Sequence, residues 1–279
     1  MRGLRWLTLG TLVAVGAVTA AIAVAQQSIP TVAVTASPTA VTLTSASVAA
    51  GPTRFEVTRQ GNKDLSVYFF LLLPGTSVED FRASIARDDR TGGEATLGLV
   101  SIQGSVSIPA SASSRGFSFT LKPNVQYVVL SEADEENSGN QPRQRGLTTF
   151  TTGAASGATA PAPNATVRMR GLRFRGAATL PRRGVVRFTN EDGVPHFALA
   201  FPLRRGVGAA RFGRALRSNN ERAFGRISSG PPVNLQNLIS GSNTANDQDV
   251  RFSRAGRYGL VCFFGEHHRL GMYRVVRVR

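Results

Sequence analysis

The chain has 279 residues, of which 42% are hydrophobic, so it is long enough and apolar enough for one large or two ordinary globular domains. Its 33 Lys and Arg residues outnumber 17 Asp and Glu residues, which gives a formal net charge of +16. A single cysteine excludes a fold held together by disulfides within the chain.

The first 25 residues have the pattern of a secretory signal peptide (residues 1–25). Two arginines precede an uncharged stretch that ends on the small residues Ala23-Val24-Ala25, where we expect cleavage. A retained membrane anchor is the alternative, because the stretch approaches spanning length, although Ala, Gly and Thr dilute its hydrophobicity. We therefore expect an extracytoplasmic protein that is secreted, periplasmic or at the cell surface, and that contacts a membrane only if this segment is retained.

The rest of the chain consists of two similar halves. A stretch rich in Gly, Ala and Pro at residues 153–164 is typical of a linker, which predicts domains at residues 28–152 and 165–279. Aromatic landmarks recur in the two halves at a nearly constant offset and indicate an internal duplication. These landmarks pair as Phe55 with Phe188, Phe81 with Phe212, and Tyr127 with Tyr258.

Each half is predicted to be mostly β-strand. Runs that alternate apolar and polar residues, separated by Gly, Pro or Asn, favour antiparallel sheets with one buried face. The clearest runs are RFEVTRQ, SVYFFLLL, FSFTL and QYVVLS in the first half, and VVRFTN, HFALAF, VRFS, YGLVCFF and MYRVVRVR in the second. Apolar residues at helical spacing after Ser77, which is a possible N-cap, and again around Phe212 predict one short helix in an inter-strand connection of each half. The predicted fold class is all-β, with two tandem Greek-key β-sandwiches.

Residues that ligate soft metals are concentrated in the second half. The stretch YGLVCFFGEHHRLGM contains the only cysteine, Cys262, together with His267, His268 and Met272. The remaining histidine, His196, begins a predicted strand farther upstream, at a separation that a Greek-key sandwich can close. A thiolate, two imidazoles and a thioether are the ligands of a blue-copper electron-transfer site. Zinc is the competing metal, but structural zinc sites prefer further Cys or His to a thioether.

Two motifs in the second half resemble the cupredoxin family, which includes plastocyanin, azurin and rusticyanin. FTNEDGVPHFALAF is similar to the strand and turn before the family's first histidine ligand, and YGLVCFFGEHHRLGM is similar to its Cys, His and Met loop. The resemblance covers about residues 167–279 and implies one type 1 copper ion. It implies His196 and His267 as imidazole ligands, Cys262 as the thiolate ligand and Met272 as the axial ligand.

Adjacent histidines leave a choice for the second imidazole ligand. With His267 the spacing is Cys-x4-His-x4-Met, as in the rusticyanin type of loop, whereas His268 gives x5 and x3. We expect His267 to be the ligand and His268 to lie at the exposed rim. Phe263 and Phe264 flank the thiolate in sequence and are expected to help keep the site dry.

The first half resembles the cupredoxin fold more loosely and contains no His, Cys or Met. If its QYVVLS run aligns with YGLVC, Ser131 stands at the position of Cys262, and the position of His196 falls within residues 63–65. The segment EADEENSGNQPRQRG replaces the ligand loop, and we expect a solvated loop rather than a calcium site because EF-hand spacing is absent. We therefore predict a cupredoxin-like domain without copper ligands.

An enzyme is not expected, although two-domain cupredoxins include copper nitrite reductases and small laccases. A trinuclear copper centre needs about eight imidazoles, and a catalytic type 2 copper about three beyond the blue site, whereas the chain has three histidines in all. Neither a G-x-S-x-G nucleophile motif nor a phosphate-binding loop is present, so no small-molecule substrate is expected.

The positive charge is concentrated in the second half. From residue 165 onward, 21 arginines face six acidic residues, whereas residues 26–164 are nearly neutral. Such a field suits an acidic redox partner or an anionic cell surface. The alternative is a GC-rich coding bias, because 31 of the 33 basic residues are Arg. Nucleic acid is not expected as a partner of an exported chain without basic motifs rich in aromatic residues.

The sequence as a whole predicts an exported blue (type 1) copper protein that acts as a one-electron carrier. The alternative function is an extracytoplasmic copper-binding or cell-surface interaction module without redox turnover.

Overall fold

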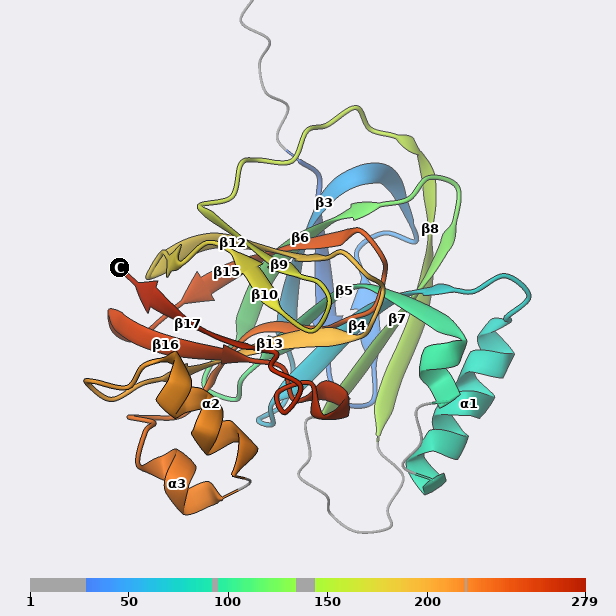
Figure 1. The fold of residues 1–279 in the computed structure, drawn as a ribbon. Coiled ribbons are helices and arrows are strands. Elements are labelled where there is room, and N and C mark those ends of the chain that lie inside the picture. Colours follow the sequence, from blue (N-terminus) through green and yellow to red (C-terminus); the bar gives the residue numbers. More distant parts are fainter. Residues whose placement is uncertain (1–28, 92–94, 134–143, 219) are drawn as a thin grey trace, which may run out of the picture.

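A computed structural model describes residues 29–91, 95–133, 144–218 and 220–279, and its fold is nearly all-β, as predicted (Figure 1). The first half contains β1 (Thr31–Ala36), β2 (Val41–Leu43), β3 (Ser47–Arg59), β4 (Leu65–Leu72), α1 (Val78–Thr91), the 3-10 helix η1 (Ala95–Gly98), β5 (Val100–Ile108), β6 (Ser114–Leu121), β7 (Gln126–Ala133) and β8 (Arg145–Ala155). The second half contains β9 (Ala165–Met169), β10 (Phe174–Gly176), β11 (Thr179–Leu180), β12 (Arg183–Asn190), β13 (His196–Pro202), α2 (Ala209–Arg217), α3 (Glu221–Gly225), β14 (Val233–Ile239), β15 (Thr244–Arg251), β16 (Gly256–Val261), the 3-10 helix η2 (Phe264–Glu266) and β17 (Tyr273–Val278).

The core of the first half follows from alternation along its strands. In β1, Val32, Val34 and Ala36 are buried while the residues between them are more exposed, because successive side chains of a strand point to opposite faces. Aromatic rings fill the centre of this core, with ring centroids 4.5 to 6.3 Å from that of Phe55. The rings around Phe55 belong to Phe69, Phe117, Phe119 and Phe150.

The second half has a core of its own, which reaches the predicted ligand loop. Three aromatic side chains are fully buried there: Phe188 of β12, Phe252 directly after β15, and Tyr258 of β16. The rings of Phe252 and Tyr258 lie 4.8 Å apart. Cys262 and Met272 belong to the same buried cluster. The two ends of the segment that carries the predicted ligands are therefore packed in the core, whereas several residues between them are exposed.

The two halves share one scheme of strand pairing. In the first half β3 lies parallel to β1 and antiparallel to β6, and in the second half β12 lies parallel to β9 and antiparallel to β15. In the same way β4 lies between β5 and β7, and β13 lies between β14 and β16. All three predicted landmark pairs occupy matching elements: β3 and β12, α1 and α2, β7 and β16. This matching supports the predicted duplication of a β-sandwich.

The predicted helices lie in the connections between β4 and β5 and between β13 and β14. In α1 the backbone N–H of Asp80 donates to Ser77 Oγ at 3.0 Å, which confirms Ser77 as the N-cap, and Phe81 is fully buried. In α2 Phe212 and Leu216 are buried, as predicted. The structure adds a second short helix, α3, whose N-cap Asn220 accepts from the N–H of Ala223 at 3.1 Å.

The halves meet edge to edge through backbone hydrogen bonds. Strand β15 pairs antiparallel with β6, so one sheet continues from the second half into the first. Arg54 on β3 also forms a two-point ion pair with Asp249 on β15. A buried polar seam lies beside this joint. Asn246 donates to the carbonyl of Gln103 at 2.7 Å, and Gln248 donates to the carbonyl of Ser105 at 2.8 Å.

The domain limits 28–152 and 165–279 remain predictions. Strand β8 continues to Ala155, three residues into the predicted linker, and a connection without helix or strand then crosses to β9 (Figure 1). The predicted signal peptide and most of the predicted acidic loop, residues 134–143, lie outside the described residues. Among the helices of the described part, none combines the length and apolar character needed to cross a bilayer.

Candidate metal centre

Two neighbouring strands place the first two predicted ligands at one end of the second half. His196 is the first residue of β13, and Cys262 directly follows β16. These strands are antiparallel neighbours, with Leu199 opposite Val261. A strand that begins and a strand that ends at the same edge bring residues that are far apart in sequence together.

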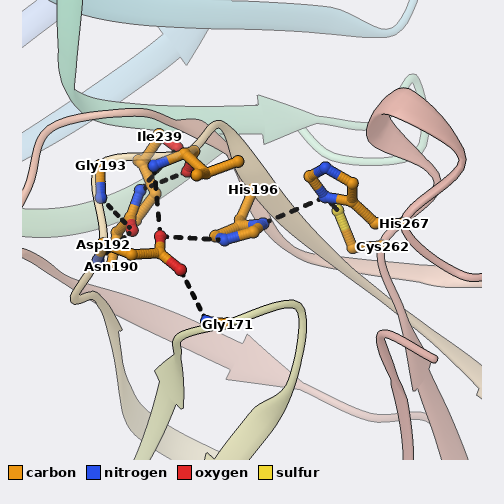
Figure 2. A network of polar contacts seen from close by, with 9 residues as sticks. Gly171, Asn190, Asp192, Gly193, His196, Ile239, Cys262 and His267 are labelled. Carbon is orange, nitrogen blue, oxygen red and sulfur yellow. Dashed lines mark hydrogen bonds and ion pairs between the residues drawn. The ribbon is translucent and has the colours of Figure 1, made fainter. Parts of the chain in front are cut away.

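His196, Cys262 and His267 converge in the interior (Figure 2). The Nδ1 atoms of His196 and His267 lie 3.3 Å apart, and Cys262 Sγ lies 3.7 Å from Nδ1 of His267. One ligand atom from each of the three residues lies within 4.8 Å of the others. His196 and Cys262 are completely buried, and His267 is 7% exposed. A thiol and two imidazole nitrogens thus face one common point.

Asp192 holds His196 from the opposite side of the ring. Its Oδ1 lies 3.2 Å from His196 Nε2, and its Oδ2 accepts the backbone N–H of Gly171 at 2.7 Å (Figure 2). The carboxylate accepts a hydrogen bond from Nε2–H of the neutral ring, so Nδ1 of His196 is the unprotonated nitrogen, and it faces His267 and Cys262. The hydrogen bond to Asp192 therefore leaves Nδ1 of His196 in the unprotonated form that can bind a metal.

The turn before His196 is built by Asn190. Its Oδ1 accepts from the N–H groups of Asp192 and Gly193, and its Nδ2 donates to the carbonyls of Val194 and Ile239. Gly193 has φ of 76°, a conformation that glycine adopts without a Cβ penalty. The NEDG stretch therefore fixes the direction from which the chain enters β13.

The loop from Cys262 to Met272 is closed by its own backbone. The N–H of Cys262 donates to the carbonyl of Met272 at 3.2 Å, and the N–H of Met272 donates to the carbonyl of His267 at 2.9 Å. Gly265 and Glu266 both have positive φ, at 48° and 59°, so the chain turns sharply before His267. Met272 is completely buried and lies in the same cluster as Cys262.

Burial controls the protonation of the candidate ligands. It raises the pKa of the Cys262 thiol to about 11, an effect that the backbone N–H groups of Phe197 and Phe264 partly oppose. Burial lowers the pKa of His196, although the carboxylate of Asp192 favours the charged ring. At neutral pH the thiol therefore keeps its proton, and His196 is a neutral imidazole.

The environment of His268 corrects the prediction that this residue lies at an exposed rim. His268 is only 9% exposed, and its ring packs 4.8 Å from that of Phe263. Burial and the neighbouring Arg269 lower its pKa. It is not part of the converging group. Its Nδ1 is a buried atom without a hydrogen-bond partner among the described residues.

The two phenylalanines after Cys262 have different surroundings. Phe264 packs against the core cluster with its ring 5.6 Å from that of His267, in agreement with the expected cover of the site. Phe263 is 36% exposed, so it covers the site less completely than predicted. Its ring lies 6.2 Å from that of Phe201.

No comparable group of candidate metal ligands is found among the described residues of the first half. Matching strand registers place Ser131 at the position of Cys262 and Leu65 at the position of His196, inside the predicted range 63–65. Ser131 is buried and donates to the carbonyl of Ser37 at 2.7 Å. The two matching positions therefore carry a hydroxyl and an aliphatic side chain, and the absence of copper from the first half remains a prediction.

Asp192 is the residue that the sequence reasoning missed. Its signal was present, because an acidic residue precedes His196 by four positions within a predicted turn. That spacing alone does not show which of several nearby carboxylates faces the ring, since Glu191 instead pairs with Arg168 at 3.7 Å.

A scan against protein-family models finds no match to this sequence, and a search of the curated proteins finds none. Among solved structures, auracyanin B matches 44% of this chain and 95% of its own, at 24% identity and a TM-score of 0.27. Auracyanin A, described as a "blue" copper protein from the thermophilic photosynthetic bacterium Chloroflexus aurantiacus, matches 45% of this chain and 99% of its own, at 13% identity and a TM-score of 0.28. A copper nitrite reductase from Nitrosomonas europaea matches 90% of this chain and 94% of its own, at 12% identity and a TM-score of 0.25. Similarity at this level does not determine function, which has to be inferred from the site.

Proposed function

We propose that this protein binds one copper ion in a type 1 site of the cupredoxin kind and acts as a one-electron carrier. His196, His267 and Cys262 would supply two imidazoles and a thiolate, and Met272 would supply a thioether. The observation that carries the proposal is the convergence of three buried donor atoms within 4.8 Å of one another.

The chemistry of the donor set fits a soft cation. A fully buried thiol whose pKa is raised to about 11 remains protonated at neutral pH unless a cation stabilises its thiolate. His196 is neutral, and Asp192 fixes its Nε2 proton so that Nδ1 is free. A metal ion binds imidazole only in its neutral form, which is the form that His196 has here.

The chain's own residues hold the donor atoms in place. Copper, when bound, would gain or lose a single electron between its Cu(II) and Cu(I) states. His196 and Cys262 lie on hydrogen-bonded neighbouring strands, and the hydrogen bond from Cys262 to Met272 closes the loop between them. This framework would hold the four side chains in similar positions whether copper is oxidised or reduced, which suits electron transfer.

We further propose that the protein is not an enzyme. The chain contains three histidines, and the two that join Cys262 belong to the site described above. Only His268 remains, whereas a catalytic type 2 copper needs about three further imidazoles. Export to an extracytoplasmic location is part of the same proposal and depends on the sequence of residues 1–25.

The test is metal analysis of the purified protein together with its visible spectrum. We expect one copper per chain and an intense visible thiolate-to-copper band in the Cu(II) form. Cys262→Ser should abolish the band and leave the far-UV circular dichroism unchanged. A colourless protein with one copper, or tight zinc and no copper, would contradict the carrier function.

A potentiometric titration separates the carrier from the alternative, a copper-binding or interaction module without redox turnover. The carrier should show a reversible one-electron couple in the visible band. Copper that binds but does not cycle reversibly would favour the module.

A further inference from the structure

The segment that carries α2 and α3 is far more basic than its counterpart in the first half. Residues 203–227 contain seven arginines and one acidic residue. The matching residues 72–96, which carry α1, contain three arginines and five acidic residues. A coding bias would act on both segments, so it does not account for this difference.

Four of these arginines form what we name the cationic platform: Arg211, Arg214, Arg222 and Arg226. All four are exposed on α2 and α3 or directly after α3. No ion pair is found for any of them among the described side chains, whereas Arg54, Arg145 and Arg187 pair with carboxylates within the fold. The platform arginines are therefore not used to stabilise the described fold through ion pairs.

Three platform arginines lie around one shallow depression between the two helices. Arg211, Arg214 and Arg226 line this depression, whose volume is about 340 Å³, and Ala215 and Ala223 provide its small apolar surface. Guanidinium groups around a depression of this size suit carboxylates, which they bind through two parallel N–H groups.

Aromatic contacts connect the platform to the loop from Cys262 to Met272, which we name the metal loop. Phe224 of α3 packs on Phe201 with ring centroids 4.7 Å apart, and Phe201 packs on Phe263, the residue after Cys262, at 6.2 Å. Arg217 of α2 donates to the hydroxyl of Tyr273, the residue after Met272, at 3.1 Å. Figure 1 shows α2 and α3 on the side of the molecule that carries β16 and β17.

We propose that the cationic platform docks an acidic redox protein and thereby brings it against the metal loop. The inference rests on the proposed electron-carrier function and adds the partner's chemistry and its docking surface. Carboxylates of the partner bind the platform arginines, and the edge next to Phe263 becomes part of the contact. A partner held there lies beside Phe263, the residue that follows the candidate ligand Cys262 in the chain.

A protein suits the platform better than an anionic membrane. The charge is combined with a connection to the metal loop, and only a partner with its own redox group gains from that connection. The charges also form a local cluster on two helices, which favours association with a complementary acidic face.

Binding to an acidic peptide tests the platform without any metal. The probe is a fluorophore-labelled poly-L-glutamate, titrated with the full metal-free chain and followed by fluorescence anisotropy at low ionic strength. The platform variant combines Arg211→Gln, Arg214→Gln, Arg222→Gln and Arg226→Gln. The control variant removes the same charge from exposed arginines on β10, β12, β15 and β17: Arg175→Gln, Arg183→Gln, Arg251→Gln and Arg277→Gln.

We expect the platform variant to lose roughly tenfold or more in affinity and the control variant clearly less, because exposed charges act mainly within a Debye length. Equal losses in the two variants, or no binding by the unmodified protein, overturn the proposal. Circular dichroism of both variants checks that they fold.

Two further measurements fix the location and the class of the partner. Amide resonances of Phe263 and Leu270 in the metal-free protein should shift when the peptide binds, and unchanged resonances there would overturn docking beside the metal loop. Vesicles of phosphatidylcholine with phosphatidylglycerol should not compete for the platform. If the platform binds these vesicles and not the peptide, the partner is a membrane surface and the proposal is wrong. None of these results depends on copper, so they remain distinct from a failure of the proposed function.

Discussion

Ser131 in the first half occupies the position that Cys262 occupies in the second. Each follows a buried tyrosine, Tyr127 or Tyr258, by four residues; Ser131 lies within β7, and Cys262 directly follows the matching strand β16. The hydroxyl of Ser131 donates to the carbonyl of Ser37, so the first half satisfies this buried polar atom within its own backbone. The same fold position therefore carries a candidate ligand in one half and a structural hydrogen bond in the other.

A cysteine placed at position 131 should not create a copper site in the first half. In a chain with Ser131→Cys and Cys262→Ser, we expect no blue colour, because Leu65 stands where His196 stands and the first half has no imidazole. The visible spectrum after copper addition provides the measurement. Appearance of the blue band in this double variant would show that the two halves are more alike than their side chains indicate.

The adjacent histidines should respond differently to substitution. His267→Ala removes one of the three converging donors and should abolish the blue spectrum, whereas His268→Ala should leave it largely intact. The two residues are similarly buried, at 7% and 9%, so each variant is a control for the packing change in the other. The reverse result would mean that the loop places His268 on the metal.

Asp192→Asn should weaken Cu(II) binding without disturbing the fold. Loss of the carboxylate that accepts from His196 should lower Cu(II) affinity by roughly 10- to 100-fold. If Cu(I) affinity is unchanged, the reduction potential rises by about 60 to 120 mV, since a tenfold change corresponds to about 59 mV for one electron.

Glu191→Gln provides the matched control for this prediction. Glu191 is the next carboxylate in sequence and pairs with Arg168 rather than with the histidine, so its removal should leave the potential almost unchanged. Nitrogen chemical shifts of His196 in the metal-free protein report the tautomer directly. Equal potentials in the two variants would exclude a role of Asp192 in positioning His196.

Alkaline pH should destabilise the protein through Tyr127. Burial raises the pKa of this phenol to about 12, whereas in the unfolded chain it ionises near 10. Between these values the folded state holds one more proton than the unfolded state, so stability is lost as pH rises. The full effect is about 2 to 3 kcal/mol.

Denaturant unfolding from pH 9 to 12 measures this loss, and Tyr127→Phe should show a shallower decline. The substitution also removes the acceptor for the N–H of Lys122, so only the slope with pH, not the absolute stability, is compared. Parallel curves for the two proteins would assign the alkaline loss to other groups.

The sequence predicted those parts of the fold that depend on local pattern. Ser77 and Phe81 mark the start and the buried face of α1, because capping and helical spacing are properties of a few consecutive residues. Cys262 and His267 are five residues apart, so their proximity in space also follows from their short separation in sequence. His196 joined them in the prediction because a Greek-key sandwich brings such strands together.

The parts that the sequence did not predict depend on contacts between distant segments. The pairing of β6 with β15 uses backbone groups, which every residue carries, so side-chain pattern does not identify the partner strand. The burial of His268 depends on the ring of Phe263 across a loop turn. The role of Asp192 likewise depends on the direction of a side chain after the turn, which spacing alone does not specify.

The joint between β6 and β15 also has a consequence for solubility. A strand at the end of a sheet exposes unpaired N–H and carbonyl groups, which template aggregation with other chains. In this protein each of the two strands covers the exposed edge of the other, and because both belong to one chain, the cover does not depend on protein concentration. The first half therefore has a structural role that does not require metal ligands, because its strand β6 permanently covers the edge of β15 in the second half.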